Sequence, residues 1–141
     1  MKNVLVAFVC IFCLLNGEAQ STDNKETTID TLLFTKKSSR YFEAEYDTIN
    51  KLSFKEVRKM SDRSKTISIK LSFTDGAGTM LEIFNPFPRQ LIYKAELYSY
   101  SKKDFVETST IPVEAKLLSF ENWPYKIDRL RLSGFMLIKA D

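Results

Sequence analysis

The chain has 141 residues, a formal net charge of +3 and no histidine. This length fits one domain. The mild positive charge, interspersed with acidic residues, argues against a nucleic-acid partner, which requires a clustered basic face. Without histidine there is no Ser-His-Asp triad and no Cys-His pair.

The first residues have the pattern of a cleaved signal peptide. Lys2 precedes an unbroken apolar run, 4–15. This run is shorter than the roughly 20 residues that span a bilayer. Asn16 and Gly17 then break it, and small residues precede a predicted cut after Ala19. The pattern predicts export to a periplasm or the extracellular space; a core helix or a retained membrane anchor is the alternative.

Cleavage after Ala19 removes Cys10 and Cys13, which are the two cysteines of the chain. The mature part then has no disulfide and no thiolate metal site, and no later apolar stretch approaches a membrane span. A lipoprotein signal is less favoured, because large residues precede both cysteines. The absence of an Asn-x-Ser/Thr sequon slightly favours a bacterial source.

Residues 20–28 are polar and predict a disordered leader, and 29–141 form one β-rich domain. The clearest pattern is strict alternation over 66–73, followed by a glycine turn at 75–78 and a partner strand over 79–84. Other strands are predicted over the following ranges: 29–34, 40–49, 91–98, 105–113, 115–120, 127–132 and 135–138. Residues 52–57 form a less regular apolar segment. A bulge is predicted at Ser133 and Gly134.

These seven to nine short strands, with turn residues between them and one polar face each, predict antiparallel pairing. Two sheets packed face to face suit a chain of this size. We therefore expect an immunoglobulin-like β-sandwich, with a small β-barrel as the alternative. No internal repeat and no second domain is indicated.

Catalytic, metal and cofactor residues are not predicted. The two glycines after Asp75 lead into a strand rather than a helix, which excludes a phosphate loop. Carboxylates such as Glu43 and Glu45, or Glu114 beside Lys116, alternate in the manner of a solvated sheet face. No Asp-x-Asp-x-Asp run suggests calcium.

The candidate binding residues are aromatic side chains beside prolines. Phe87 lies between two prolines, and Trp123 and Tyr125 flank Pro124. Flat rings in the loops of a sandwich stack on sugars or anchor a protein partner. Arg89 can add hydrogen bonds, as can Arg129. The alternative is that these rings plug the open ends of the core.

The sequence thus favours an exported, non-enzymatic binding or scaffold domain of the cell envelope or extracellular space. Its partner is a glycan or an envelope protein, and its oligomeric state is open. Two alternatives remain. One is a carboxylate-dependent enzyme acting on polysaccharide. The other is a subunit of an envelope assembly joined through a strand edge.

Overall fold

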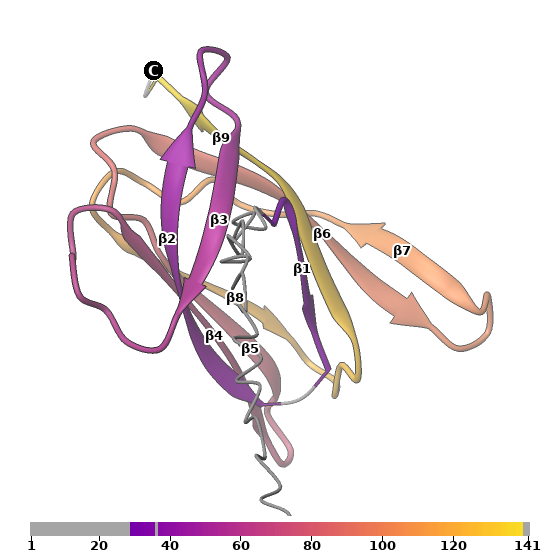
Figure 1. The fold of residues 1–141 in the computed structure, drawn as a ribbon. Coiled ribbons are helices and arrows are strands. Elements are labelled where there is room, and N and C mark those ends of the chain that lie inside the picture. The colour runs from indigo at the N-terminus through magenta and orange to yellow at the C-terminus, as the bar shows by residue number, and fades with distance from the viewer. Residues whose placement is uncertain (1–28, 36, 140–141) are drawn as a thin grey trace, which may run out of the picture.

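A computed structural model of the chain describes residues 29–35 and 37–139. The predicted signal peptide and leader lie outside these ranges. The described residues form nine strands in two antiparallel sheets, which pack as a sandwich (Figure 1). The predicted antiparallel β-sandwich is confirmed. The small barrel is wrong, because the ladder of strands divides into two separate sheets.

One sheet has four strands and the other has five. The order in the four-stranded sheet is β1 (Thr31–Phe34), β9 (Leu130–Ile138), β6 (Gln90–Ser99) and β7 (Asp104–Thr108). The order in the five-stranded sheet is β3 (Leu52–Val57), β2 (Ser38–Tyr46), β4 (Thr66–Thr74), β5 (Gly78–Phe84) and β8 (Leu118–Trp123).

The core lies between the sheets because most of the strands bury alternate side chains. In β4, Ile67, Ile69 and Leu71 are buried, whereas Lys70 between them is exposed. In the other sheet, β6 buries its own alternate set, which includes Leu91. Complete burial of such a side chain stabilises the fold by roughly 1.5–3 kcal/mol.

The predicted strand over 105–113 ends early, at Thr108. Pro112 lies in the segment beyond it, and a proline cannot donate to a ladder. Val113 returns to pair with Leu91 in an isolated bridge. The next strand begins at Leu118 rather than 115, because Lys116 adopts a left-handed φ of 62° that no strand accommodates.

The two strands predicted at the C-terminal end are one strand, β9, with a bulge. Gly134 has a φ of 62°. Ile92 of β6 pairs with Met136, but Lys94 pairs with Ser133, so β9 has one more residue than β6 between these two pairs. The predicted bulge is confirmed, and it lets β9 continue across the sheet instead of ending.

The crossing from β5 to β6 is organised by Asn85, which is fully buried. Its Nδ2 donates to the carbonyl oxygens of Arg89 at 2.7 Å, Val113 at 3.0 Å and Glu114 at 3.1 Å. Its Oδ1 accepts from the backbone N–H of Phe87 at 3.0 Å. One side chain therefore fixes the proline corner against the segment that leads to β8.

The hairpin of β6 and β7 is the feature that positions the candidate site. β7 pairs only with the second half of β6, from Ala95 to Ser99. In Figure 1 this hairpin extends away from the body of the sandwich. One face of the hairpin lines a cleft whose other side includes Tyr125, on the loop that connects β8 to β9.

Candidate functional site: a cleft beneath the β6–β7 hairpin

The four predicted binding residues lie at two opposite ends of the sandwich. Trp123 pairs with Thr79 at the start of β5, whereas Phe87 and Arg89 follow the other end of that strand. Phe87 and Trp123 are only 5% and 7% exposed, and Arg89 is half-buried. Tyr125 is 54% exposed. Burial of Phe87 and Trp123 fits the alternative reading, in which these rings close the ends of the core.

The end that contains Arg89 is closed by internal contacts. An Nη2 donor of Arg89 bonds Oδ1 of Asn50 at 2.5 Å and the carbonyl oxygen of Leu137 at 3.4 Å. The guanidinium lies over the ring of Tyr46, which meets the Phe87 ring edge-on at 5.9 Å. Arg89 thus ties the two sheets together here, and its donors serve the fold.

Tyr125 lies at the other end, on a loop held by Gly78 and Thr79. The buried hydroxyl of Thr79 donates to the carbonyl oxygen of Tyr125 at 2.9 Å and accepts from the N–H of Ile127 at 2.9 Å. Gly78 has a φ of 88°, and an added Cβ would lie 2.0 Å from the carbonyl oxygen of Trp123. The sequence Gly-Thr at the start of β5 therefore permits close packing of the loop and fixes the Tyr125 backbone.

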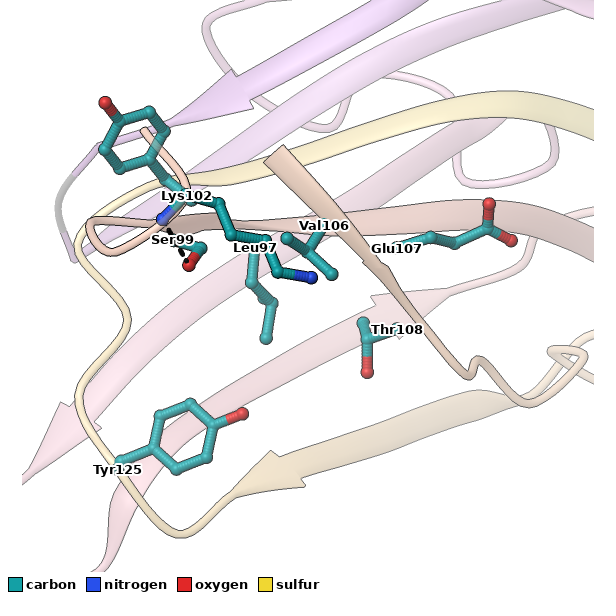
Figure 2. Close-up of a pocket in the computed structure, with 8 residues that line it drawn as sticks. Leu97, Ser99, Lys102, Val106, Glu107, Thr108 and Tyr125 are labelled. Carbon is teal, nitrogen blue, oxygen red and sulfur yellow. Dashed lines mark hydrogen bonds between the residues drawn. The ribbon is translucent and has the colours of Figure 1, made fainter. Parts of the chain in front are cut away.

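A cleft of about 360 Å³ lies between this loop and the β6–β7 hairpin. The hairpin side is formed by Leu97 and its cross-strand partner Val106, with Thr108 next along β7. Figure 2 shows these side chains on one side of the space and the Tyr125 ring on the other. The opening is broad, so an extended ligand can enter from solvent.

Polar groups surround this apolar wall. Ser99 and Lys102 line the cleft near the hairpin turn, where the Lys102 N–H donates to Oγ of Ser99 at 3.4 Å. Figure 2 shows the Lys102 side chain directed into the cleft, whereas the Glu107 carboxylate extends away from it. The arrangement combines a flat ring, two aliphatic side chains, hydroxyl groups and an ammonium group.

Tyr125 also borders a second cleft, of about 330 Å³, on the side of the β4–β5 turn. Phe73 and Asp75 line it together with Lys126. The exposed ring of Tyr125 therefore stands between two hollows, and a ligand longer than one sugar or one amino acid can contact the ring from either side.

The opposite face of the hairpin is stiffened by stacked arginines. Nε and Nη2 of Arg131 each donate to one carboxylate oxygen of Glu96 at 2.7 Å. The Arg131 guanidinium also lies 4.2 Å from the centre of the Phe105 ring. Arg129 lies 4.6 Å from the centre of the Tyr98 ring. Hydrogen bonds from Arg131 lower the pKa of Glu96. These contacts hold β6, β7 and β9 together beneath the cleft wall.

The acidic residues considered for catalysis lie apart in other contacts. Glu43 accepts from Ser61 at 3.0 Å, and Glu114 accepts from Gln90 at 2.6 Å. Over 29–35 and 37–139, no cluster of three or more His, Cys, Asp or Glu side chains could hold a metal.

The buried carboxylate of Glu121 joins the two sheets. Its Oε1 accepts from the hydroxyl of Tyr93 at 2.7 Å and from the N–H of Ile111 at 2.9 Å. Burial, followed by the hydrogen bond to Glu121, raises the pKa of Tyr93, so this phenol stays protonated. The pair crosses between β6 and β8 and satisfies a polar contact inside the sandwich.

The sequence identified Tyr125 but missed the hairpin side of the cleft. Leu97 falls in the alternating strand expected over 91–98, and Lys102 lies outside every expected strand. Val106 and Thr108 carry no local pattern that distinguishes them. Their approach to Tyr125 depends on how far the hairpin extends over the β8–β9 loop, which is a tertiary property.

No described segment of the chain forms a helix of the length and apolarity needed to cross a membrane. Comparison of the chain with models of protein families, with curated proteins and with solved structures finds no match.

Proposed function

We propose that this chain is an exported, non-enzymatic binding domain of the cell envelope or extracellular space, and that its ligand lies in the cleft beneath the β6–β7 hairpin. The observation that carries the proposal is the placement of Tyr125. Its ring is exposed on an anchored loop, opposite the apolar wall of Leu97 and Val106. Export rests on the signal-peptide pattern of residues 1–19.

The chemistry of the cleft favours a carbohydrate. The flat ring of Tyr125 offers a stacking surface for the C–H face of a sugar. The Thr108 and Ser99 hydroxyls and the Lys102 ammonium group can bond sugar hydroxyls around it. A volume of about 360 Å³ lies within the usual range of small-ligand sites, roughly 300–1,000 Å³.

Rigidity of both walls supports a binding role. The Tyr125 loop is bonded to the buried Thr79 hydroxyl, and the hairpin is held by the Arg131–Glu96 pair. A ligand entering such a site orders few additional groups, so little of the interaction free energy is lost to conformational entropy.

An array of oligosaccharides tests this proposal. The wild-type protein should bind a defined subset, and Tyr125→Ala should lose at least about tenfold in affinity for it, which is the loss of one stacked ring. Tyr46→Ala is the matched control, because Tyr46 is equally exposed but lies beside Arg89 at the other end. Equal binding by wild type and folded Tyr125→Ala, or no binding by wild type, would contradict the proposal.

A further inference from the structure

Strand β8 is an edge of the five-stranded sheet, and its outer face is apolar. Leu118 is 46% exposed and Phe120 is 54% exposed. Met80, the neighbour of Asn122 on β5, is also exposed, as is Leu117 immediately before the strand. Four of the exposed large apolar side chains of the described residues therefore lie on or beside this strand. Such surfaces on a small domain mark contacts with another protein.

The other edge strands of the two sheets are protected in ways that β8 is not. β3 carries Lys55 and Glu56, and β7 carries Asp104 and Glu107. β1 has only four residues. Short length and charge are the usual means of preventing an edge from pairing. β8 has six residues, and its single charged side chain, Glu121, points inward to Tyr93.

The backbone of β8 is arranged to accept a further strand. The N–H of Asn85 donates to the carbonyl oxygen of Leu117, so these two residues form a hydrogen-bonded pair. Because such pairs alternate along an antiparallel ladder, Ser119 and Glu121 bond β5. The N–H and C=O groups of Leu118, Phe120 and Asn122 therefore face the free edge.

From this placement we propose that β8 pairs antiparallel with β8 of a second copy of this chain, about a two-fold axis at Phe120. All three residues with outward-facing backbone then form hydrogen-bonded pairs: Phe120 with the Phe120 of its copy, and Leu118 with Asn122 in both directions. The two five-stranded sheets become one continuous sheet. An interface of this kind is self-complementary, as two-fold symmetry requires.

Charge favours this register over its neighbours. With the axis at Phe120, Glu121 lies opposite Ser119 of the copy, whereas an axis at Glu121 would oppose two carboxylates. On the outer face, Glu82 lies beside Phe120 and is already neutralised by Lys70 at 2.6 Å. The Phe120 side chains of the two copies therefore lie side by side on the outer face, with no unpaired charge next to them.

The molar mass of the purified protein in solution tests the pairing, by light scattering after size exclusion. The wild type should have twice the mass of one chain, and Phe120→Lys should have the mass of one chain. Asn122→Lys, an exposed position opposite Leu118 of the copy, should have the same effect and decides the outcome if Phe120→Lys is unfolded by circular dichroism. Leu33→Lys is the matched control, because Leu33 is exposed on the β1 edge; it should retain the doubled mass.

A wild-type protein with the mass of one chain overturns the proposal, including the case in which β8 pairs only with a different protein. Retention of the doubled mass by both folded lysine variants also overturns it, since the contact would then lie elsewhere. These outcomes depend on the measured molar mass alone, so they are independent of whether the Tyr125 cleft binds a carbohydrate.

Discussion

The hydroxyl of Thr79 donates to the carbonyl oxygen of Tyr125 across 2.9 Å, although the two residues are 46 positions apart. The same oxygen accepts from the N–H of Ile127. Thr79→Val keeps the shape of the side chain but leaves both backbone groups without this partner. We expect Thr79→Val to lower the free energy of unfolding by about 1–2 kcal/mol and to weaken ligand binding. Thr79→Ser keeps the hydroxyl and should stay closer to wild type in urea unfolding; a Thr79→Val variant as stable as wild type would contradict this role of the hydroxyl.

Alanine substitutions at two glycines of the β4–β5 turn distinguish the cost of backbone strain from the cost of steric overlap. Both Gly76 and Gly78 have positive φ, of 79° and 88°. A Cβ at Gly76 has nothing within 4 Å, whereas one at Gly78 would overlap the carbonyl of Trp123. Gly76→Ala should cost about 1–2 kcal/mol, the strain of a left-handed residue.

Gly78→Ala should cost clearly more than Gly76→Ala, because the loop that carries Tyr125 must shift away. Thermal unfolding of both variants measures the difference, and binding to the selected oligosaccharide reports whether Tyr125 has moved. A Gly78→Ala variant no less stable than Gly76→Ala would contradict the close packing of this loop.

The Tyr93–Glu121 hydrogen bond links the two sheets inside the sandwich. Tyr93→Phe removes a donor from a buried carboxylate and should destabilise the fold by about 1–3 kcal/mol. Glu121→Gln should cost less, because its amide oxygen can still accept from both Tyr93 and Ile111. Urea denaturation of the two variants checks this order; the reverse order would mean that the charge of Glu121, and not the hydrogen bond, stabilises the contact.

Arg40 confers a pH dependence on stability. Its Nε and Nη2 bond the two oxygens of Glu56 at 2.8 and 2.7 Å, and its guanidinium lies between the rings of Phe34 and Phe42. Hydrogen bonding from Arg40 lowers the pKa of Glu56 below its usual 4.5. A lowered pKa contributes stability above the unfolded value, and this contribution is lost as the pH falls through the folded value.

The free energy of unfolding should therefore fall on acidification below about pH 5. Arg40→Met should have a shallower fall than wild type, because Glu56 then titrates alike in the folded and unfolded states. Lys103→Met removes an exposed positive charge in the turn between β6 and β7, on the other sheet from Glu56, and should leave the profile unchanged. Parallel wild-type and Arg40→Met profiles would contradict the assignment.

The sheet structure could be predicted because apolar and polar residues alternate locally along the strands. Ile67, Ile69 and Leu71 repeat every second residue, and a turn with two glycines follows. Such patterns need no knowledge of distant residues. The late start of β8 differs from the expectation, since the left-handed conformation of Lys116 has no signal in residue type.

The site could be predicted only in part, for a physical reason. Phe87, Trp123 and Tyr125 look alike in sequence, as aromatic residues beside prolines. Their exposure depends on contacts with residues distant in the chain. Arg89 and Tyr46 cover one end of the sandwich, whereas Thr79 bonds the backbone of Tyr125 at the other end. Contacts between residues so distant in the chain cannot be derived from spacing.

Mapping of ligand contacts by nuclear magnetic resonance tests the central claim most directly. The oligosaccharide with the highest array signal is titrated into isotope-labelled protein, and backbone amide shifts are followed. The shifts should be largest at Tyr125 and along the hairpin at Ser99, Lys102, Val106 and Thr108. Shifts concentrated around Arg89 and Tyr46, or spread along the outer face of β8 with Tyr125 unaffected, would contradict a ligand site beneath the hairpin.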